Sequence, residues 1–321
     1  MGMSGDHHLK VGTWVTERHF LMSQQDLVIV AVDGGEPSNN AVRWAANTAM
    51  KRGVPLQLAS SYTMPQFLYA EGMVPPQELF DDLQRECLNK IEAAREIAKE
   101  VAPDIEIGHT VAEGSPIDML LDLSKDATMI VMGSRGLGGL SGMVLGSVSA
   151  AVVSHAACPV VVVREDNAVT DETKYGPVVV GVDGSDVSVK ATRVAFEEAH
   201  ARGAELVAVH TYLENQMHEP VAGAILGDDQ WSKFEEERET KLDSALAPLV
   251  EQFPDVKVTK VVTRDRPVRA LVDQSKNAQL LITGSHGRGG FKGMLLGSTS
   301  RALLQAAPCP MMVVRPERLP K

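Results

Sequence analysis

A pattern of the form Gly, two residues, Gly, nine residues, Gly, Ser occurs twice in the sequence. Its members are Gly133, Gly136, Gly146 and Ser147 in the first copy and Gly284, Gly287, Gly297 and Ser298 in the second. Glycine allows positive φ and close approach of backbone to a ligand, and a helix start offers free N–H groups and a positive dipole end. Together these features bind phosphate through backbone amides. The alternative for a single copy is an ordinary glycine-rich loop with a serine helix cap.

Each copy requires a strand before it and a helix after it. The apolar runs at 128–132 and 279–283 end in glycine, which is typical of buried parallel strands. The residues that follow, 147–155 and 298–306, have helical spacing of their apolar positions. The glycines therefore lie between a strand and a helix, with the motif serine at each helix start.

The two patterns are parts of a longer duplication. Residues 133–164 and 284–315 align without a gap, and 18 of the 32 positions are identical. Shared composition does not produce this degree of identity, so we infer that one domain is present twice. The duplication also favours a binding role over the loop-and-cap alternative, because both copies keep the same spacing.

The two copies resemble the nucleotide-binding motif of the universal stress protein family, in its ATP-binding branch. The resemblance covers two tandem domains, nearly the whole chain after residue 26. It implies ATP as the ligand, one molecule per domain, with Mg²⁺ as an optional companion. The implied ligand-binding residues of the first domain are Ala31, Asp33, Ser61, Gly133, Ser134, Arg135, Gly136, Gly138, Gly139, Gly146, Ser147, Val148 and Ser149. Those of the second domain are Gly181, Asp183, Thr211, Gly284, Ser285, His286, Gly287, Arg288, Gly289, Gly290, Gly297, Ser298, Thr299 and Ser300.

Asp33 and Asp183 follow the first expected strand of each domain. A carboxylate at the carboxyl end of this strand in a parallel α/β sheet points into the ligand crevice. In the family the matching aspartate contacts the nucleotide, whereas the alternative is an Asp–Gly turn or a helix cap. The resemblance also implies that the backbone of Ser61 and Thr211 meets the adenine.

Two further pairs of candidate residues have open alternatives. Arg135 and His286 occupy the same place inside the Gly-x-x-Gly turn, where they either meet phosphate or ribose or point to solvent. Ser149 and Ser300 match a family hydroxyl that reaches the terminal phosphate. The alternative for this pair is a serine in the first helical turn that bonds locally to the backbone.

Each copy follows the order β-α-β-α-β-α-β-α-β, which implies a parallel sheet with helices on both faces. We predict an α/β fold of two tandem Rossmann-like domains. The resemblance implies that each is a five-stranded parallel sheet in the order 3-2-1-4-5, and that the domains pair through their last strands. The predicted boundaries are a disordered extension at 1–25, a first domain at 26–164, a linker at 165–176 and a second domain at 177–317. An alternative for the extension is that native translation begins near Met22.

Composition and charge exclude several kinds of partner. The net charge is −11 and no basic run of useful length occurs, so the chain lacks the basic patch that a nucleic-acid partner needs. No apolar run reaches transmembrane length. The three cysteines form no C-x-x-C pair, which fits a reducing cytoplasm, and Cys158 and Cys309 are expected to be small buried side chains. We predict a cytoplasmic homodimer with ATP as its ligand, internal pairing of its two domains, and neither nucleic acid nor membrane as a partner.

Other catalytic and metal-binding motifs do not occur in the sequence. A Walker A loop needs Gly-Lys-[Ser/Thr], which the chain lacks. The dinucleotide pattern G-x-G-x-x-G fails in both copies, since Ser141 and Lys292 stand where its third glycine is required. The histidines show no ligand spacing and no G-x-S-x-G elbow occurs. We therefore predict no metal site and no catalytic residue.

We predict an ATP-binding universal stress protein that regulates stress response or growth through its nucleotide-dependent state. The alternative is a slow ATPase or adenylate-forming enzyme, which needs a placed base and usually held Mg²⁺; Asp33 and Asp183 are the only candidates common to both repeats. A third alternative, a docking scaffold with degenerate sites, is disfavoured by the intact glycines. We expect the second site to bind tighter, because Gly181 stands where the first domain has Ala31, whose methyl group would crowd the nucleotide.

Overall fold

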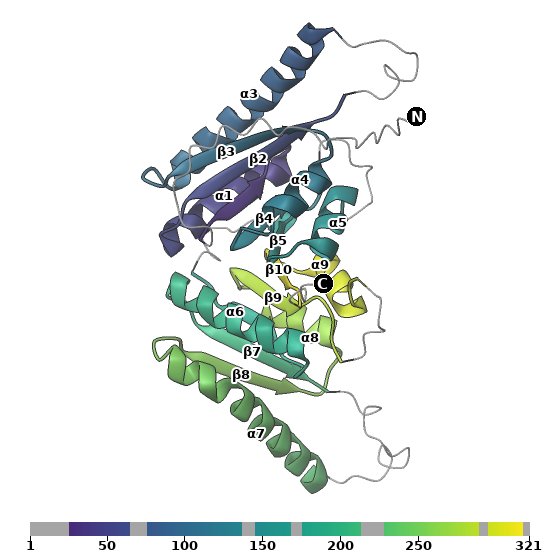
Figure 1. Cartoon of the computed structure of the whole chain (residues 1–321). Coiled ribbons are helices and arrows are strands. Elements are labelled where there is room, and N and C mark those ends of the chain that lie inside the picture. Colours follow the sequence, from purple (N-terminus) through teal and green to yellow (C-terminus); the bar gives the residue numbers. More distant parts are fainter. Residues whose placement is uncertain are drawn as a thin grey trace, which may run out of the picture.

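The computed structural model describes residues 26–64, 76–136, 145–167, 175–212, 228–288 and 295–316, with the backbone alone at 228–233. The predictions for residues 1–25, most of the expected linker and the tips of both glycine loops therefore lie outside the described residues. Figure 1 shows the described chain as two similar halves joined side by side along one sheet.

The elements alternate as the sequence predicts. The first half contains β1 (Val28–Ala31), α1 (Glu36–Arg52), β2 (Leu56–Tyr62), α3 (Gln77–Val101), β3 (Ile107–Glu113), α4 (Pro116–Leu123), β4 (Met129–Gly133), α5 (Ser147–His155) and β5 (Val160–Val163). After the short 3-10 helix η1 (Glu165–Asn167), the second half contains β6 (Val178–Gly181), α6 (Asp186–Arg202), β7 (Leu206–Thr211), α7 (Asp228–Gln252), β8 (Val258–Thr263), α8 (Pro267–Gln274), β9 (Leu280–Gly284), α9 (Ser298–Ala306) and β10 (Met311–Val314). The α/β prediction is confirmed.

One ten-stranded sheet runs through both halves, in the order β3-β2-β1-β4-β5-β10-β9-β6-β7-β8. Within each half the strands are parallel, which confirms the predicted order 3-2-1-4-5. The halves join where β5 and β10 pair antiparallel, with Val162 opposite Met311 and Val160 opposite Val313. The predicted pairing through the last strands is therefore confirmed.

The strands read as valine- and isoleucine-rich runs because both of their faces are covered by helices. The core on one face is formed with α1, α3, α6 and α7, and the core on the other with α4, α5, α8 and α9. Both cores contain residues of both halves, so the sheet is covered continuously. Burial raises the pKa of Cys158 and Cys309 to about 12, and both thiols are small buried side chains, as predicted.

Two equivalent arginines tie the halves together, one just after β5 and the other just after β10, at opposite ends of this antiparallel strand pair. The Arg164 guanidinium donates to the carbonyl of Gln305 in the last turn of α9, and Arg315 donates to the carbonyl of Ser154 in the last turn of α5. Cations at these helix ends are favourable because the last carbonyls carry the negative end of the helix dipole. Each half therefore caps the glycine-motif helix of the other.

The segment expected to be a linker begins with ordered contacts. Asn167 is buried, and its side-chain amide donates to the carbonyls of Ala307 (3.3 Å) and Cys309 (2.8 Å) in the second half. Its carbonyl oxygen accepts the Arg164 backbone N–H at 2.7 Å. The first residues of the expected linker at 165–176 are therefore fixed to the second half by a buried amide, and the linker boundary stays a prediction.

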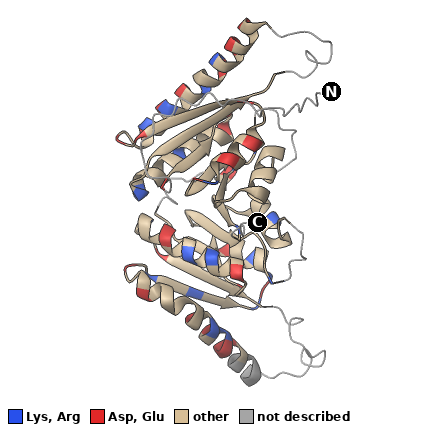
Figure 2. Cartoon of the chain, viewed as in Figure 1, with Lys and Arg blue, Asp and Glu red and all other residues tan. Residues whose placement is uncertain are grey.

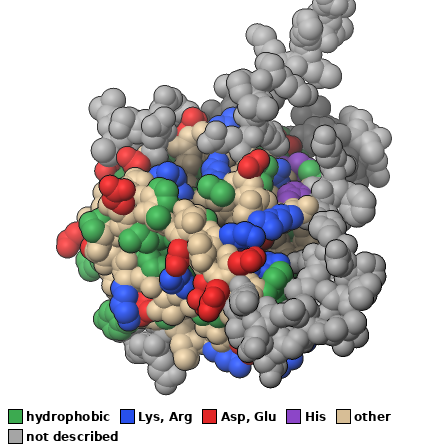
Figure 3. All heavy atoms as spheres, turned by 90° about the horizontal axis from the view of Figure 1, so that it is seen from below, with side chains coloured by type: hydrophobic (Ala, Val, Ile, Leu, Met, Phe, Trp, Pro, Cys, Tyr) green, Lys and Arg blue, Asp and Glu red, His purple; other side chains and the backbone are tan. Residues whose placement is uncertain are grey.

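The described surface mixes both signs of charge. Figure 2 shows Lys and Arg residues interspersed with Asp and Glu residues along the outer helices α3 and α7. The face seen in Figure 3 has the same mixture, with hydrophobic side chains scattered among the charges. Of the helices in the described part, none is long and apolar enough to cross a membrane.

A buried charge cluster joins α1 and α6 across the boundary between the halves. Glu198, which is 0% exposed, accepts from Arg52 Nε at 3.0 Å and also forms an ion pair with Arg202. Arg202 donates to Thr48 Oγ1 at 3.0 Å and lies 5.2 Å from the centre of the Trp44 ring. Burial and the charge of Arg52 lower the pKa of Arg202 to about 9, so the guanidinium stays charged at neutral pH. Two cations therefore share one buried carboxylate.

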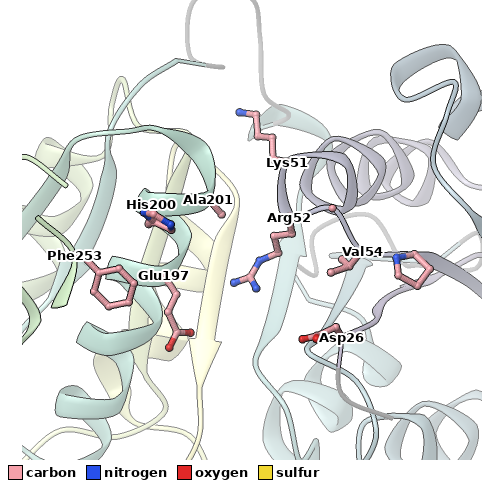
Figure 4. A pocket seen from close by; sticks show the side chains of 10 residues that line it. Asp26, Lys51, Arg52, Val54, Glu197, His200, Ala201 and Phe253 are labelled. Carbon is pink, nitrogen blue, oxygen red and sulfur yellow. The ribbon is translucent and has the colours of Figure 1, made fainter. Parts of the chain in front are cut away.

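A cavity of about 550 Å³ lies beside this cluster, between the two halves. Figure 4 shows side chains of the second half facing those of the first across it. Lys51 and Arg52 supply positive charge to its wall and Asp26 and Glu197 supply negative charge, so the cavity has no predominant sign. Its lining residues are Asp26, Lys51, Arg52, Gly53, Val54, Pro55, Glu197, His200, Ala201 and Phe253.

Candidate functional site

The carboxylate after the first strand of each half closes a tight turn with one of its oxygens. Asp33 Oδ1 accepts the Gly35 N–H at 2.8 Å, around Gly34 with φ of 86°. Asp183 Oδ1 accepts both the backbone N–H (2.9 Å) and the hydroxyl (2.7 Å) of Ser185. The Asp–Gly turn alternative therefore describes one oxygen of each carboxylate, Oδ1, and the turn leaves Oδ2 unused.

That second oxygen lies against the glycine loop. A Cβ atom added to Gly136 would lie 2.8 Å from Asp33 Oδ2, and one added to Gly287 would lie 2.5 Å from Asp183 Oδ2. In the second half Asp183 Oδ2 also accepts the backbone N–H of Arg288 at 3.0 Å. The fold thus brings the aspartate and the glycine motif, about a hundred residues apart in the chain, into contact in both halves.

The motif glycines that the structure describes do not have positive φ. Gly146 has φ −70° and ψ 160°, and Gly297 has φ −68° and ψ 158°, which other residues adopt readily. The expectation of positive φ is therefore wrong for these glycines. At Gly133 the structural reason for glycine is close approach instead: a Cβ there would lie 2.8 Å from the carbonyl carbon of Pro37.

Each loop returns to the strand end before its helix begins. The Ser134 N–H donates to the Val163 carbonyl at 2.9 Å, and the Gly146 N–H donates to the Ser134 carbonyl at 2.7 Å. The first intrahelical bond of α5 then runs from Ala150 N to Gly146 O at 2.9 Å. The backbone N–H groups between Gly146 and Ala150, beginning at the exposed Ser147, therefore lie at the open end of the helix.

The second half repeats this geometry. Ser285 N donates to Val314 O and Gly297 N donates to Ser285 O, both at 2.7 Å, and Arg301 N donates to Gly297 O at 3.0 Å. Ser298 is exposed like Ser147. Both helix starts thus offer the same set of backbone donors beside an aspartate, which is the arrangement expected for a phosphate-bearing ligand.

The serines two residues into the helices serve a local purpose in this structure. Ser149 Oγ donates to the Gly133 carbonyl at 2.8 Å, and Ser300 Oγ donates to the Gly284 carbonyl at 2.7 Å. Both side chains are buried. The local-bonding alternative describes this arrangement, in which each hydroxyl fixes the helix start to the end of the preceding strand.

The other candidates fall into four groups. Ser61 and Thr211 are half-buried at the carboxyl ends of β2 and β7, beside the strands that carry the aspartates. Ser134 and Ser285 are buried, Arg135 and His286 are half-buried, and His286 Nδ1 lies 3.0 Å from Ser285 Oγ. The half-buried Val148 and Thr299 are the second residues of their helices. Gly138, Gly139, Gly289 and Gly290 lie outside the described residues.

The reason given for a tighter second site does not hold. A Cβ on Gly181 would lie 3.2 Å from Leu271 Cδ1 and 3.8 Å from Thr283 Cγ2. Ala31, its counterpart, packs against the core formed with α4 and α5. The methyl group therefore points toward the core beneath the crevice, and the glycine–alanine difference gives no argument about the nucleotide.

The sequence analysis missed a basic pair beside Asp183. His210 Nδ1 lies 2.7 Å from the Val182 carbonyl, and Arg238 Nη1 lies 3.2 Å from His210 Nε2. Aligning the two repeats position by position would have revealed it, because the equivalent residues of the first half are Ser60 and Cys87. In the described residues no group of three or more His, Cys, Asp or Glu side chains could hold a metal ion.

Comparison with known proteins agrees with this architecture. The sequence model of the universal stress protein family matches residues 26–164 and 174–315. Universal stress protein Rv2005c of Mycobacterium tuberculosis (strain ATCC 25618 / H37Rv) is 40% identical over 297 residues, which cover 91% of this chain and 98% of that protein. Universal stress protein Rv2623 of the same strain is 37% identical over 290 residues, covering 90% of this chain and 96% of that protein.

A solved structure shows the same fold. The crystal structure of a universal stress protein from Archaeoglobus fulgidus DSM 4304 superposes with a TM-score of 0.63 and 18% identity, over 90% of this chain and 98% of that chain. The family match covers both halves, and the relatives align along nearly their whole length. This chain therefore belongs to the universal stress protein family, as a tandem of two such domains.

Proposed function

We propose that the chain binds two molecules of ATP, one in each half, and acts as a regulator of stress response or growth through its nucleotide-dependent state. One repeated observation supports this proposal: in both halves an aspartate oxygen touches the glycine loop that leads into an open helix start. Backbone amides at such a helix start suit phosphate, and the carboxylate suits ribose or base hydroxyl and amine donors. Because the aspartate, the glycine loop and the helix start are arranged alike in both halves, a scaffold with degenerate sites is disfavoured.

The enzyme alternative receives less support. Asp33 and Asp183, its only shared candidates for a base, already accept local backbone N–H bonds and lie at the end of the first strand. Mg²⁺ would have to be held mainly by phosphate oxygens and water, because the described side chains form no cluster for it. We further propose that the domains extend over 26–164 and 177–317, and that the protein is a cytoplasmic homodimer.

Calorimetric titration of nucleotide-stripped protein with ATP should give a stoichiometry near two. Ser147→Glu should reduce it to one, because a carboxylate at an exposed first helical position is favourable for the helix dipole and repels phosphate. Ser298→Glu should do the same in the second half, and the double variant should not bind. Ser147→Gln and Ser298→Gln, of matched size, should keep both sites. Two sites in a Glu variant would show that the phosphates lie elsewhere.

Phosphate release from ATP should be far slower than the roughly 1–100 s⁻¹ of kinases. The reason is that Asp33 and Asp183, the two candidate bases at the glycine loops, are held in local turns, so neither is free to act as a base. The measurement is steady-state phosphate release by the wild-type chain and by Asp33→Ala and Asp183→Ala. Turnover within the kinase range that disappears in either variant would favour the enzyme alternative instead.

A further inference from the structure

The two halves differ in one concerted way next to the aspartate. In the first half Ser60 on β2 and Cys87 on α3 contact each other, with 3.7 Å between Oγ and Sγ. At the equivalent places in the second half His210 on β7 and Arg238 on α7 contact each other at 3.2 Å. A small neutral pair has thus been replaced, at both of its positions, by a large basic pair.

Arg238 is held firmly in place. His210 donates from Nδ1 to the Val182 carbonyl at 2.7 Å, so its Nε2 is the acceptor for Arg238 Nη1. Burial lowers the pKa of His210, which keeps the ring neutral at pH 7. The Arg238 Cζ atom lies 4.4 Å from the ring centre of Phe234 and 4.9 Å from that of Tyr212. Stacking and a fixed tautomer therefore orient the guanidinium before any ligand arrives.

A second arginine reaches the same end of the sheet. Arg288 follows the loop glycine Gly287, and its backbone N–H donates to Asp183 Oδ2 at 3.0 Å. Its side chain lies over Gly184, because Arg288 Nη2 is the atom nearest to a Cβ added there. After burial, the charge of Arg288 is among the causes that lower the pKa of Arg238. Both arginines thus reach the carboxyl end of β6, one from α7 and one from the glycine loop.

Neither side chain of this pair is held by an ion pair in the described part of the chain. Among the residues that the structure describes, the Arg238 Nε is also buried without a hydrogen-bond partner. The oxygens of Asp183 are already used by Ser185 and by the Arg288 backbone. Two guanidinium groups that have no ion-pair partner of their own are the composition of an anion site.

The strand order places this pair away from the helix start. β6 lies between β9, which leads into the glycine loop and α9, and β7, which carries His210. A ligand whose 5′-phosphates lie at the start of α9 would extend its nucleoside across β6 toward β7. The arginine pair would then meet an acidic group on the ribose and not the 5′-phosphates.

We propose that the second half contains an additional anion subsite, formed by Arg238 and Arg288, that selects nucleotides bearing a phosphate on the ribose as well as at the 5′ position. This subsite rests on the proposed nucleotide-binding function of the same crevice. The first half, with Ser60 and Cys87 in place of the basic pair, lacks the subsite. The two halves therefore differ in preference: both accept a 5′-phosphorylated nucleotide such as ATP, and only the second gains affinity from a phosphate on the ribose.

The test uses the full chain with one site blocked at a time. In the Ser147→Glu background only the second site binds, and calorimetry at constant salt compares 5′-AMP with adenosine 3′,5′-bisphosphate and adenosine 2′,5′-bisphosphate. At least one bisphosphate should bind about tenfold tighter than 5′-AMP, as expected for a charge-assisted arginine fork. In the Ser298→Glu background, which leaves the first site, the affinity ratio should be close to one.

Arg238→Gln and Arg288→Gln should each reduce the ratio in the second site to less than about threefold. Arg288 is exposed, so its variant tests the subsite without disturbing the core, and the surface substitution Arg269→Gln should leave the ratio unchanged. A ratio near one in the parent background, or one unaffected by both glutamine variants, overturns the subsite. A preference for GMP over AMP without a ribose-phosphate effect would assign the arginines to the base and also overturn it. Failure of ATP to bind either half would instead reject the proposed function.

Discussion

Replacing Glu198 by glutamine should lower the free energy of unfolding by about 3–5 kcal/mol, the range for removing one partner of a buried ion pair. Glu198 is 0% exposed and is shared by Arg52 and Arg202, which come from different halves. Without its charge, two guanidinium groups remain close together in the boundary, one of them 2% exposed and the other 17% exposed. Urea denaturation of the chain, followed by circular dichroism, measures the change.

The charge count of the cluster gives this prediction an internal control. Arg52→Met should destabilise less than Glu198→Gln, because it leaves one cation with one carboxylate, and Arg202 keeps its bond to Thr48. Glu86→Gln, on the exposed side of α3 where the carboxylate pairs with Lys90, should change nothing measurable. If Arg52→Met were the more damaging variant, packing of the arginine stem and not charge balance would dominate the boundary.

Gly136→Ala should weaken ATP binding in the first half by about tenfold or more, a loss of at least about 1.4 kcal/mol. The new methyl group would lie 2.8 Å from Asp33 Oδ2, so the carboxylate must leave its place against the loop and give up its bond to the Gly35 N–H. Overpacking of this kind also lowers stability by about 1–3 kcal/mol. Calorimetry in the Ser298→Glu background measures the affinity, and urea denaturation measures the stability.

Gly146→Ala is the matched control in the same motif. Its backbone angles suit alanine, and its added Cβ would have its nearest neighbours at 3.5 Å, an ordinary contact. The substitution should therefore change the free energy of unfolding by less than about 1 kcal/mol, because the reduced entropy of the unfolded chain is offset by the loss of glycine at the N-cap of α5. Equal stability losses for Gly136→Ala and Gly146→Ala would mean that the aspartate contact does not distinguish the two glycines.

These two glycines also show what the sequence could and could not predict. Their spacing, the strand before them and the helix after them predicted the loop and its position, and α5 and α9 have the predicted bounds. Conformational freedom and close approach both select glycine, and the sequence does not separate these causes. The structure assigns Gly136 and Gly133 to close approach, at Asp33 and Pro37.

The strand order could be predicted because a repeated βα alternation of nearly continuous apolar strands allows few topologies. The direction of single side chains could not. Gly181 was read as facing the nucleotide, yet its missing Cβ points at Leu271 on α8, and this depends on the pleat of β6. Likewise the polar segment that contains Asn167 has the composition of a linker. Only the contacts of the Asn167 side chain with the carbonyls near β10 show that this residue is ordered.

The basic pair in the second half was missed for a related reason. His210 and Arg238 are 28 residues apart in the chain and meet because α7 packs against β8, the strand next to β7. No local motif marks them. Comparison of the two repeats indicates the pair better than either repeat alone, because the equivalent residues of the first half, Ser60 and Cys87, also contact each other. The candidate ligand residues could thus be predicted where they form a contiguous motif, and not where two distant elements supply one residue each.

The antiparallel junction of β5 and β10 has a consequence for anyone who expresses half of this gene. Separating the two halves would turn Val160–Val163 and Met311–Val314 from interior strands into edge strands. Each would be an uncharged apolar strand with unpaired backbone N–H and C=O groups along one side. Exposed edge strands of this kind pair with strands of other chains. A recombinant half should therefore dimerise through this strand with a second copy of itself, or aggregate. Because both halves belong to one polypeptide, β5 and β10 always have each other as a pairing partner.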